Sequence, residues 1–239
     1  MSHKVIAIVP SAGLGRRFGS DANKPFQILR GKPLVVWALE ALESVDAIEE
    51  IIPVLRKEDV ERGIEVFRSY NISKTKRVAT GGKERQDSVY NGLKIIVDKN
   101  CIVLIHDGVR PLIEKDLIEK VIKELLKGGK GGLKSFDGVV LGVPVKDTIK
   151  EAGSGIIRRT IKRDSLWAIQ TPQVFPYKKI SAAYKKSIKE GFYSTDDAAL
   201  MERYGGKIKV IMGSYSNIKI TTPDDLIFAE YLISKKDQL

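Results

Sequence analysis

The sequence predicts an α/β protein, built on a doubly wound and mostly parallel sheet with an inserted β-hairpin arm. Short apolar runs alternate with amphipathic segments of helical spacing, which is the repeated βα pattern. The run Cys101–Ile105 is apolar throughout, as expected for a strand buried on both faces of a parallel sheet. We expect residues 1–239 to form a single domain, with residues 142–166 as the arm.

Each element follows from its own pattern. The expected strands are apolar runs, in chain order Val5–Val9, Glu50–Leu55, Thr75–Ala79, Cys101–Ile105, Lys207–Met212 and Asn217–Ile220. The expected helices carry apolar residues three or four positions apart, and they are Pro33–Ser44, Glu58–Ser69, Gln86–Val97, Glu114–Leu126, Tyr177–Glu190, Asp196–Tyr204 and Pro223–Ser234.

The alternation of strand and helix stops after a glycine- and lysine-rich break at 128–132. Gly138–Lys150 has the character of a strand, Gly153–Gly155 that of a turn, and Ile156–Lys162 that of a returning strand. A long hairpin inserted into an α/β domain has few partners of its own. It is expected to pack on another subunit, or alternatively to fold over its own domain.

The composition is that of a soluble globular protein, with 43% hydrophobic and 30% charged residues. No apolar run approaches the roughly 20 residues that span a membrane, and the N-terminus passes directly into a strand without a signal peptide. The single cysteine, Cys101, excludes an internal disulfide framework. We therefore expect a cytoplasmic protein with no membrane partner.

The formal net charge of +11 raises the question of a nucleic-acid partner. The lysines are scattered through the helices and do not form one basic run, so no nucleic acid is expected. The positive charge would in any case concentrate small anionic substrates near the protein.

The most informative segment follows the first strand and runs from Pro10 to Gly19. A strand that opens into a glycine-rich turn presents backbone N–H groups to phosphate oxygens. It matches neither the P-loop, because Asn23 and Pro25 flank Lys24, nor the dinucleotide fingerprint, because residue 18 is Phe18. With Arg16, Arg17 and Lys24 nearby, the segment predicts a triphosphate site of another kind.

Two further loops follow strands at the edge where open α/β sheets bind their ligands. Residues 80–88 carry a glycine pair before a helix, where Asp87 and Ser88 could cap the helix or contact a ligand. Asp107 ends the central strand, where an unpaired carboxylate would be costly. A ribose hydroxyl, a metal ion or Arg110 could pair with it.

The chain offers no nucleophilic machinery. Its only histidines are His3 and His106, and no cluster has the spacing of a zinc site. Many phosphate-binding cations without a base favour chemistry in which the substrate is the nucleophile. A phosphate monoester fits, because its second pKa of about 6 leaves it largely dianionic at neutral pH. The enzyme then positions two polyanions and stabilises developing charge.

Eight motifs in order resemble those of the 2-C-methyl-D-erythritol 4-phosphate cytidylyltransferases. They are P-S-A-G-x-G-x-R, N-K-P-F, T-G-G-x-E-R-x-D-S-V, H-D-x-x-R-P, V-P-V-K-D-T, L-W-x-x-Q-T-P-Q-x-F, T-D-D-A and N-I-K-I-T-x-P-D-D-L. The resemblance implies a Rossmann-like nucleotidyltransferase fold, transfer of CMP from CTP to the polyol phosphate with release of pyrophosphate, Mg²⁺ as cofactor, a place in non-mevalonate isoprenoid biosynthesis, and a homodimer joined through the arms.

The resemblance also implies roles for residues at matching positions. Arg17 and Lys24 would stabilise charge on the triphosphate. The nucleotide would be held by Ser11, Ala12, Gly13, Gly15, Gly82 and Ser88. Asp107 would lie near the metal and the sugar hydroxyls. The remaining substrate-binding residues would be Arg110, Thr148, Arg163, Thr195 and Lys219, with Arg163 and Lys219 also catalytic and Thr148 and Arg163 coming from the partner's arm.

The sequence departs from the family pattern at two places. Lys83 stands where Asp is frequent, so no contact of this side chain with the base is inferred. Gly108-Val109 stands where two alanines are often found, in a loop that touches the substrate, and so bears on which polyol phosphate fits. Ribitol-5-phosphate cytidylyltransferase therefore stays open as an alternative, although the stretch 162–167 favours the methylerythritol enzyme. A basic, non-catalytic nucleotide- or RNA-binding module is the alternative from another class; it would show a basic face with exposed aromatic residues.

Overall fold

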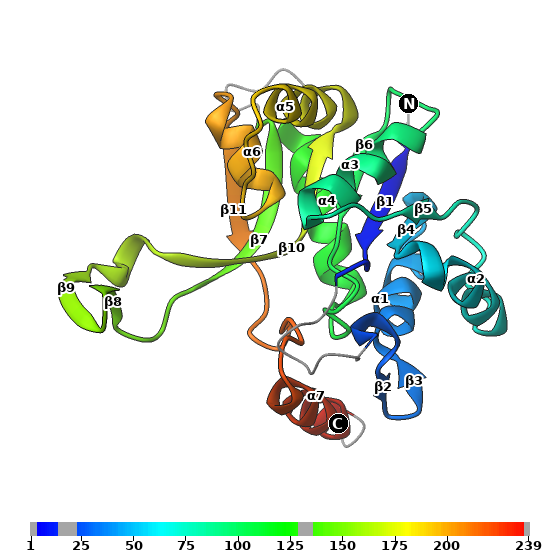
Figure 1. Ribbon diagram of the computed structural model, residues 1–239, viewed down its shortest axis with the longest axis horizontal. Helices are drawn as coiled ribbons and strands as arrows, with labels where there is room; N and C mark the ends of the chain where they lie inside the picture. Colours follow the sequence, from blue (N-terminus) through cyan, green and yellow to red (C-terminus); the bar gives the residue numbers. More distant parts are fainter. Residues whose placement is uncertain (1–3, 14–22, 129–135, 237–239) are drawn as a thin grey trace.

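The computed structural model describes residues 4–13, 23–128 and 136–236. These residues contain a seven-stranded sheet in the order β11-β7-β10-β6-β1-β4-β5 (Figure 1). The strands are β1 (Val5–Pro10), β4 (Ile48–Leu55), β5 (Ala79–Thr80), β6 (Ile102–Ile105), β7 (Gly138–Pro144), β10 (Trp167–Pro176) and β11 (Ile208–Met212). All neighbours pair in parallel except β10, which runs antiparallel to both β6 and β7. The predicted mostly parallel sheet is confirmed.

Helices cover both faces of the sheet. One face is covered by α1 (Leu34–Glu43), α2 (Val60–Ser69) and α4 (Lys115–Gly128), and the other by α3 (Arg85–Ile95), α5 (Tyr177–Lys189) and α6 (Asp197–Arg203). Successive side chains of a strand point to opposite faces. Thus Val5, Ala7 and Val9 of β1 enter the first core, while Ile6 and Ile8 enter the second. Both sides of the central strands are buried, so they read as continuous apolar runs.

The last helix, α7 (Pro223–Lys236), belongs to a third and smaller core. Its Ala229 and Ile233 pack with Leu29 of the short hairpin β2 (Ile28–Leu29) and β3 (Lys32–Pro33). The described residues also form three short 3₁₀ turns: η2 (Lys24–Phe26), η3 (Lys57–Asp59) and η4 (Arg163–Ser165).

The inserted hairpin projects from the body of the molecule (Figure 1). Its strands β8 (Ile149–Gly153) and β9 (Ile156–Ile161) pair with each other in a separate two-stranded sheet. The turn between them has positive φ at Ser154 and Gly155, the conformation that two-residue hairpin turns favour. Residues 142–144, placed at the start of the arm by sequence, belong to β7 in the main sheet.

Two predicted strands need correction, and one observed strand was not predicted. β10 was not expected, because polar residues and Pro172 interrupt its apolar pattern. Asn217–Ile220 was expected as a strand but forms no ladder; a single backbone bond, from the Ile220 N–H to the Val109 carbonyl at 2.9 Å, ties it to the loop after β6. Of Thr75–Ala79, only Ala79 is in a strand, since β5 is a two-residue edge strand beside β4.

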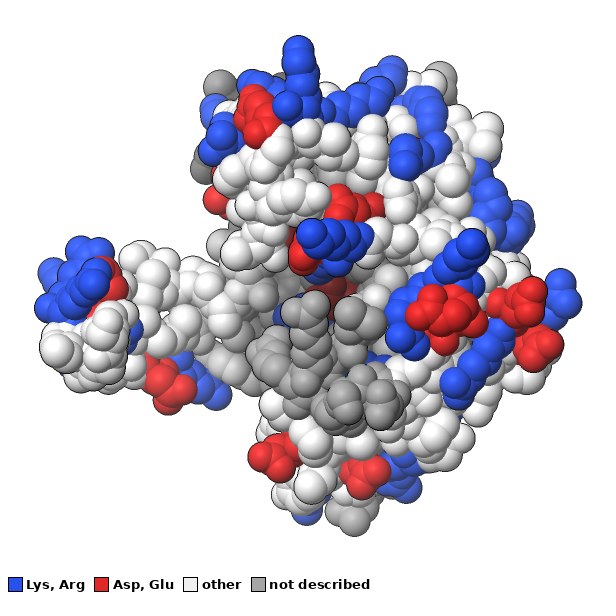
Figure 2. All heavy atoms as spheres, viewed as in Figure 1, with Lys and Arg blue, Asp and Glu red and all other residues white. Residues whose placement is uncertain are grey.

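The charged surface is mixed. On the face shown in Figure 2, Lys and Arg side chains are spread over the body and the arm tip, with Asp and Glu among them. No helix within the described ranges has the length and apolar character to cross a bilayer.

Candidate active site

The loops after β1 and β6 meet at the carboxyl edge of the sheet, where open α/β folds bind their ligands. The Gly108 N–H donates to the Pro10 carbonyl at 3.4 Å. A Cβ atom on Gly108 would lie 2.1 Å from Ser11 Oγ, so the two loops approach as closely as the absence of a side chain permits. The first loop and Asp107 are thereby placed side by side.

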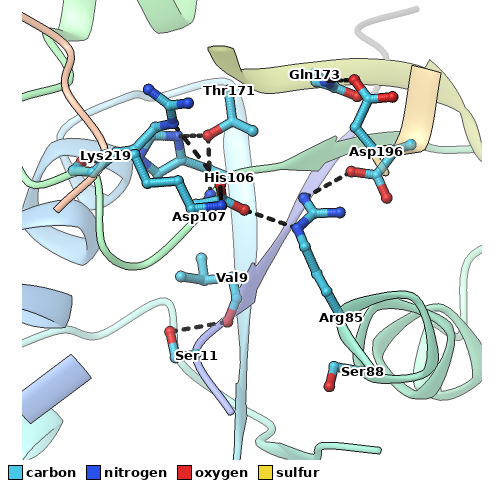
Figure 3. Close-up of polar contacts among 12 residues, drawn as sticks. Val9, Ser11, Arg85, Ser88, His106, Asp107, Thr171, Gln173, Asp196 and Lys219 are labelled. Carbon is cyan, nitrogen blue, oxygen red and sulfur yellow. Dashed lines mark hydrogen bonds and ion pairs between the residues drawn. The ribbon is translucent and has the colours of Figure 1, made fainter. Parts of the chain in front are cut away.

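Asp107 lies at the centre of a cluster of cations (Figure 3). Its carboxylate is 3.0 Å from Arg85 Nε through Oδ1 and 2.8 Å from Lys219 Nζ through Oδ2. Arg110 Nε is farther, at 3.8 Å from Oδ2. Burial opposes ionisation, but Arg85, Lys219 and Arg110 together hold the pKa of Asp107 well below its usual range. Of the three partners considered for Asp107 from the sequence, Arg110 is within ion-pair distance, and Arg85 and Lys219 make the closer contacts.

A buried hydrogen-bond chain supports the backbone of Asp107. The Asp107 N–H donates to Thr171 Oγ1 at 3.0 Å. The Arg110 carbonyl, 3.2 Å from His106 Nε2, can only accept, so Nε2 of the neutral ring carries the proton and donates to it. His106 Nδ1 then accepts from the Thr171 hydroxyl, also at 3.0 Å. Burial lowers the pKa of His106 to about 4, so the ring is neutral at neutral pH and both its nitrogens are engaged.

Thr171 reaches this position through an irregularity in β10. Between the pairs Ile169–Gly142 and Gln173–Val140, β10 has two more residues than β7. Such a bulge re-aims side chains next to functional sites. Here it turns Thr171 toward the end of β6.

The segment that carries Lys219 is fixed by side chains and not by a strand ladder. Buried Asn217 donates from Nδ2 to the Thr171 carbonyl at 2.9 Å, and its own carbonyl accepts from Arg110 NH1 at 2.7 Å. The Lys219 side chain points into the site, because its Nζ lies 2.8 Å from Asp107 Oδ2. Within the described part of the chain Arg110 Nε is a buried donor without a hydrogen-bond partner.

The expected nucleotide loop is described only as far as Gly13; Gly15 and Arg17 lie outside the described residues. The Ser11 N–H donates to the Val54 carbonyl at 2.8 Å and is thus committed to the protein. A Cβ on Gly81 would lie 2.2 Å from the Cβ of Ala12, so the loop after β5 packs against the glycine-rich loop. Lys24 is buried in the first position of η2.

The second glycine pair leads into α3 as expected. Ser88 Oγ accepts from the Gly82 N–H and donates to the Glu84 carbonyl, both at 3.1 Å. Asp87 accepts from the Glu84 N–H at 3.0 Å. These contacts support the capping interpretation, and the same bonds set the orientation of Gly82.

Thr195 is exposed and lines a cleft of about 590 Å³ together with Lys83 and Arg85. The size is that of a small-molecule site. The neighbouring Asp196 caps α6 by accepting from the Ala199 N–H at 2.9 Å.

Thr148 and Arg163 are exposed on the arm, and the Arg163 guanidinium donates to the Lys146 carbonyl. No contact of the described chain brings either residue to Asp107. They stand apart from the other predicted substrate residues within one subunit.

Sequence reasoning missed three contributors to the site: Arg85, Asp197 and Thr171. All three lie inside the quoted motifs, yet spacing could not show that Arg85 reaches two carboxylates 22 and 112 residues away in the chain. Asp197 is fully buried at the start of the helix expected over Asp196–Tyr204, and nothing in the local sequence distinguishes it from an exposed residue of the first turn.

Comparison with known proteins assigns the chain to a family. A sequence model of the 2-C-methyl-D-erythritol 4-phosphate cytidylyltransferase family matches residues 5–235. The chain belongs to this family. The protein of that name from Clostridioides difficile is 43% identical over 236 residues, covering 97% of this chain and 95% of its own. The protein of that name from Syntrophus aciditrophicus is 42% identical over 241 residues, with 99% of both chains covered.

A solved structure agrees. The 4-diphosphocytidyl-2C-methyl-D-erythritol synthase of Anaerococcus prevotii is similar with a TM-score of 0.83 and 33% identity, over 98% of this chain and 97% of that one. The resemblance inferred from the ordered motifs is confirmed at the level of the family and of its nucleotidyltransferase fold.

Proposed function

We propose that this protein transfers CMP from CTP to 2-C-methyl-D-erythritol 4-phosphate, giving 4-diphosphocytidyl-2-C-methyl-D-erythritol and pyrophosphate, in isoprenoid precursor biosynthesis. The observation that carries the proposal is the family match over residues 5–235, nearly the whole chain. The site agrees with it, because its cations outnumber its carboxylates at the edge of the sheet where two anionic substrates must meet.

The chain's own groups support a reaction without a protein nucleophile. His106 is neutral, buried and hydrogen-bonded at both nitrogens. Burial, the largest cause, raises the pKa of the Cys101 thiol to about 11, so it stays protonated. The substrate phosphate, already ionised, would attack the α-phosphorus of CTP. Pyrophosphate leaves as the new P–O bond forms.

Positioning and charge stabilisation are then the work of the protein. The backbone of the glycine-rich loop with Arg17 and Lys24 would hold the triphosphate and stabilise charge as pyrophosphate departs. Lys219 would orient the attacking phosphate. The buried Arg110 Nε, a donor with no hydrogen-bond partner among the described residues, would bind a substrate oxygen beside Asp107.

Mg²⁺ is part of the proposal. The described residues contain no group of three or more His, Cys, Asp or Glu side chains able to hold a metal. One carboxylate is nevertheless enough for Mg²⁺, which is often bound through one or two carboxylates and substrate phosphates. Asp107 would be that ligand, and the ion would neutralise charge on the triphosphate.

We also propose a cytoplasmic homodimer joined through the arms. The arm of one subunit leaves Thr148 and Arg163 without contact to their own site, and its tip exposes Ile156 and Ile157 to 72% and 59%. A partner's arm could bury that surface and bring the two polar residues to the polyol phosphate.

The test is release of pyrophosphate on incubation with CTP, Mg²⁺ and either 2-C-methyl-D-erythritol 4-phosphate or ribitol 5-phosphate. Release with the first alone supports the proposal, and release with ribitol 5-phosphate alone overturns it. Lys24→Ala and Arg17→Ala should each lower turnover by at least about 100-fold, as loss of a preorganised charge does. The control is Lys99→Ala, which should leave turnover unchanged. Lys99 is exposed and precedes β6, at the opposite edge of the sheet from the site.

Binding of RNA without catalysis is the competing reading of the basic charge. Saturable RNA binding at physiological salt in a filter assay, combined with no pyrophosphate release, would favour it over the transferase.

A further inference from the structure

Arg85 joins the candidate active site to a buried anchor. Its guanidinium contacts Asp107 Oδ1 through Nε at 3.0 Å and Asp197 Oδ2 through NH2 at 2.9 Å. In Figure 3 the Arg85 side chain extends from α3 toward Asp107. One cation thus links a carboxylate beside the substrates to a carboxylate at the start of α6.

Asp197 is itself fixed by a second contact, through the carboxylate oxygen that Arg85 does not bind. Asp197 is completely buried, and its other oxygen, Oδ1, accepts a hydrogen bond from the Tyr184 hydroxyl of α5. Burial, with Asp197 next, raises the pKa of Tyr184 well above its ordinary value, so the phenol remains a donor. The chain Tyr184–Asp197–Arg85–Asp107 is therefore continuous and joins α5, α6, α3 and the loop after β6.

The burial of Asp197 needs an explanation. A carboxylate without exposure is costly unless it is paired and hydrogen-bonded, and replacing such a pair with apolar residues is often neutral or stabilising. Asp197 does not touch the cleft directly. Its oxygens are occupied by Tyr184 and by Arg85, and Arg85 is what connects it to the site.

Lys219 is the more exposed of the two close partners of Asp107. Its side chain is 39% exposed and belongs to a segment without a strand ladder, whereas Arg85 comes from the first position of an eleven-residue helix. Arg85 also binds Oδ1 while Lys219 binds Oδ2, so the two cations together fix the plane of the carboxylate.

We propose that Arg85 is a positioning residue, which acts through Asp107 and is itself set in place by Asp197 and Tyr184. The inference deepens the proposed function and rests on it, because Asp107 is the group that touches the substrates. Arg85 fixes the direction of that carboxylate before either substrate binds.

The direct test is the position of Asp107 in crystal structures of the wild-type protein, Arg85→Met and Asp197→Asn. We expect the Asp107 side chain to change rotamer, or to occupy two, in Arg85→Met, and the Arg85 side chain to move in Asp197→Asn. If Asp107 keeps its place in Arg85→Met, the inference is wrong, whatever reaction the protein catalyses. Should Arg85→Met fail to fold, the double variant with Asp197→Asn removes the unpaired buried charge and serves in its place.

The kinetic test is a double-mutant cycle on kcat/KM. Arg85→Met should lower kcat/KM by about 100-fold, the cost of a displacement of about 1 Å in a reacting group, and Arg85→Lys should recover part of it. In the Asp107→Asn background the same Arg85→Met change should cost little further, because its target is already altered. Equal losses in the two backgrounds would overturn the inference.

Arg77→Met is the matched control. Arg77 forms a two-point ion pair with Glu50, and its side chain is 31% exposed against 27% for Arg85. It should lower stability without lowering kcat/KM. If the wild-type protein releases no pyrophosphate with any polyol phosphate, the proposed function fails, while the crystal structures still decide the role of Arg85.

Discussion

Replacing Thr171 with Val should destabilise the fold more than replacing it with Ser. Val keeps the shape and methyl group of a residue that is only 4% exposed but removes the hydroxyl. The Asp107 N–H then loses its acceptor at 3.0 Å, and His106 Nδ1 loses its donor at the same distance. A buried polar group left without its partner costs about 1–3 kcal/mol. Two such groups, with partial relaxation, give an expected loss of about 2–4 kcal/mol.

Thr171→Ser is the matched comparison, because it keeps both hydrogen bonds and removes one buried methyl group, at a cost of about 1 kcal/mol. Urea unfolding followed by circular dichroism measures both variants, and the midpoint should shift while the slope stays constant. A Val variant as stable as the Ser variant would show that the His106–Thr171–Asp107 chain contributes nothing, and the reasoning would be refuted.

Three other changes test the site and its supports. Arg163→Ala should act mainly on the polyol phosphate, raising its KM or lowering kcat while the KM for CTP changes little; unchanged values for the polyol phosphate reject the role. Gly81→Ala should raise the KM for CTP, because the new Cβ would lie 2.2 Å from the Cβ of Ala12. Ala12 has no side-chain rotamer that would relieve this clash, so the glycine-rich loop would have to shift. An unaltered CTP affinity measured by calorimetry counts against this prediction. Asp225→Ala should lower the free energy of unfolding by about 1 kcal/mol near neutral pH, since Asp225 accepts from the Thr221 hydroxyl and N–H, both at 2.7 Å, at the start of α7. Burial opposes ionisation of Asp225, but these hydrogen bonds hold its pKa below the usual 3.8. The stability that they add is therefore present above pH 3.8 and is lost as the pH falls below this value. The difference in unfolding free energy between wild type and variant, measured by urea unfolding, should disappear in acid, and a difference that stays constant with pH contradicts this.

The sequence predicts the sheet well where local pattern and burial agree. Val5–Val9 and Cys101–Ile105 are apolar on both faces because helices cover both, and their short length and β-branched residues favour a strand over a buried helix. The pattern fails at Trp167–Pro176, where the bulge that aims Thr171 also breaks the alternation that would have marked a strand. The error and the functional feature have the same cause.

The candidate site was also predicted only in part from the sequence. Asp107 could be singled out because a carboxylate at the end of a buried strand needs a partner, and that much follows from local sequence. The identity of the closest partners could not be foreseen, because Arg85 and Lys219 arrive from α3 and from the segment after β11. Only the tertiary fold decides which of the 41 Lys and Arg residues lie within reach.

The continuity of β10 sets where this protein can tolerate a change of length. One end of the strand, Trp167, joins the arm, and its middle carries Thr171 to His106 and Asp107. Deleting one residue between Trp167 and Thr171 would turn the following side chains to the opposite face of the sheet. The turn at Ser154 and Gly155 has no such connection, so relatives could lengthen or shorten the hairpin there while the catalytic edge of the sheet stays in register.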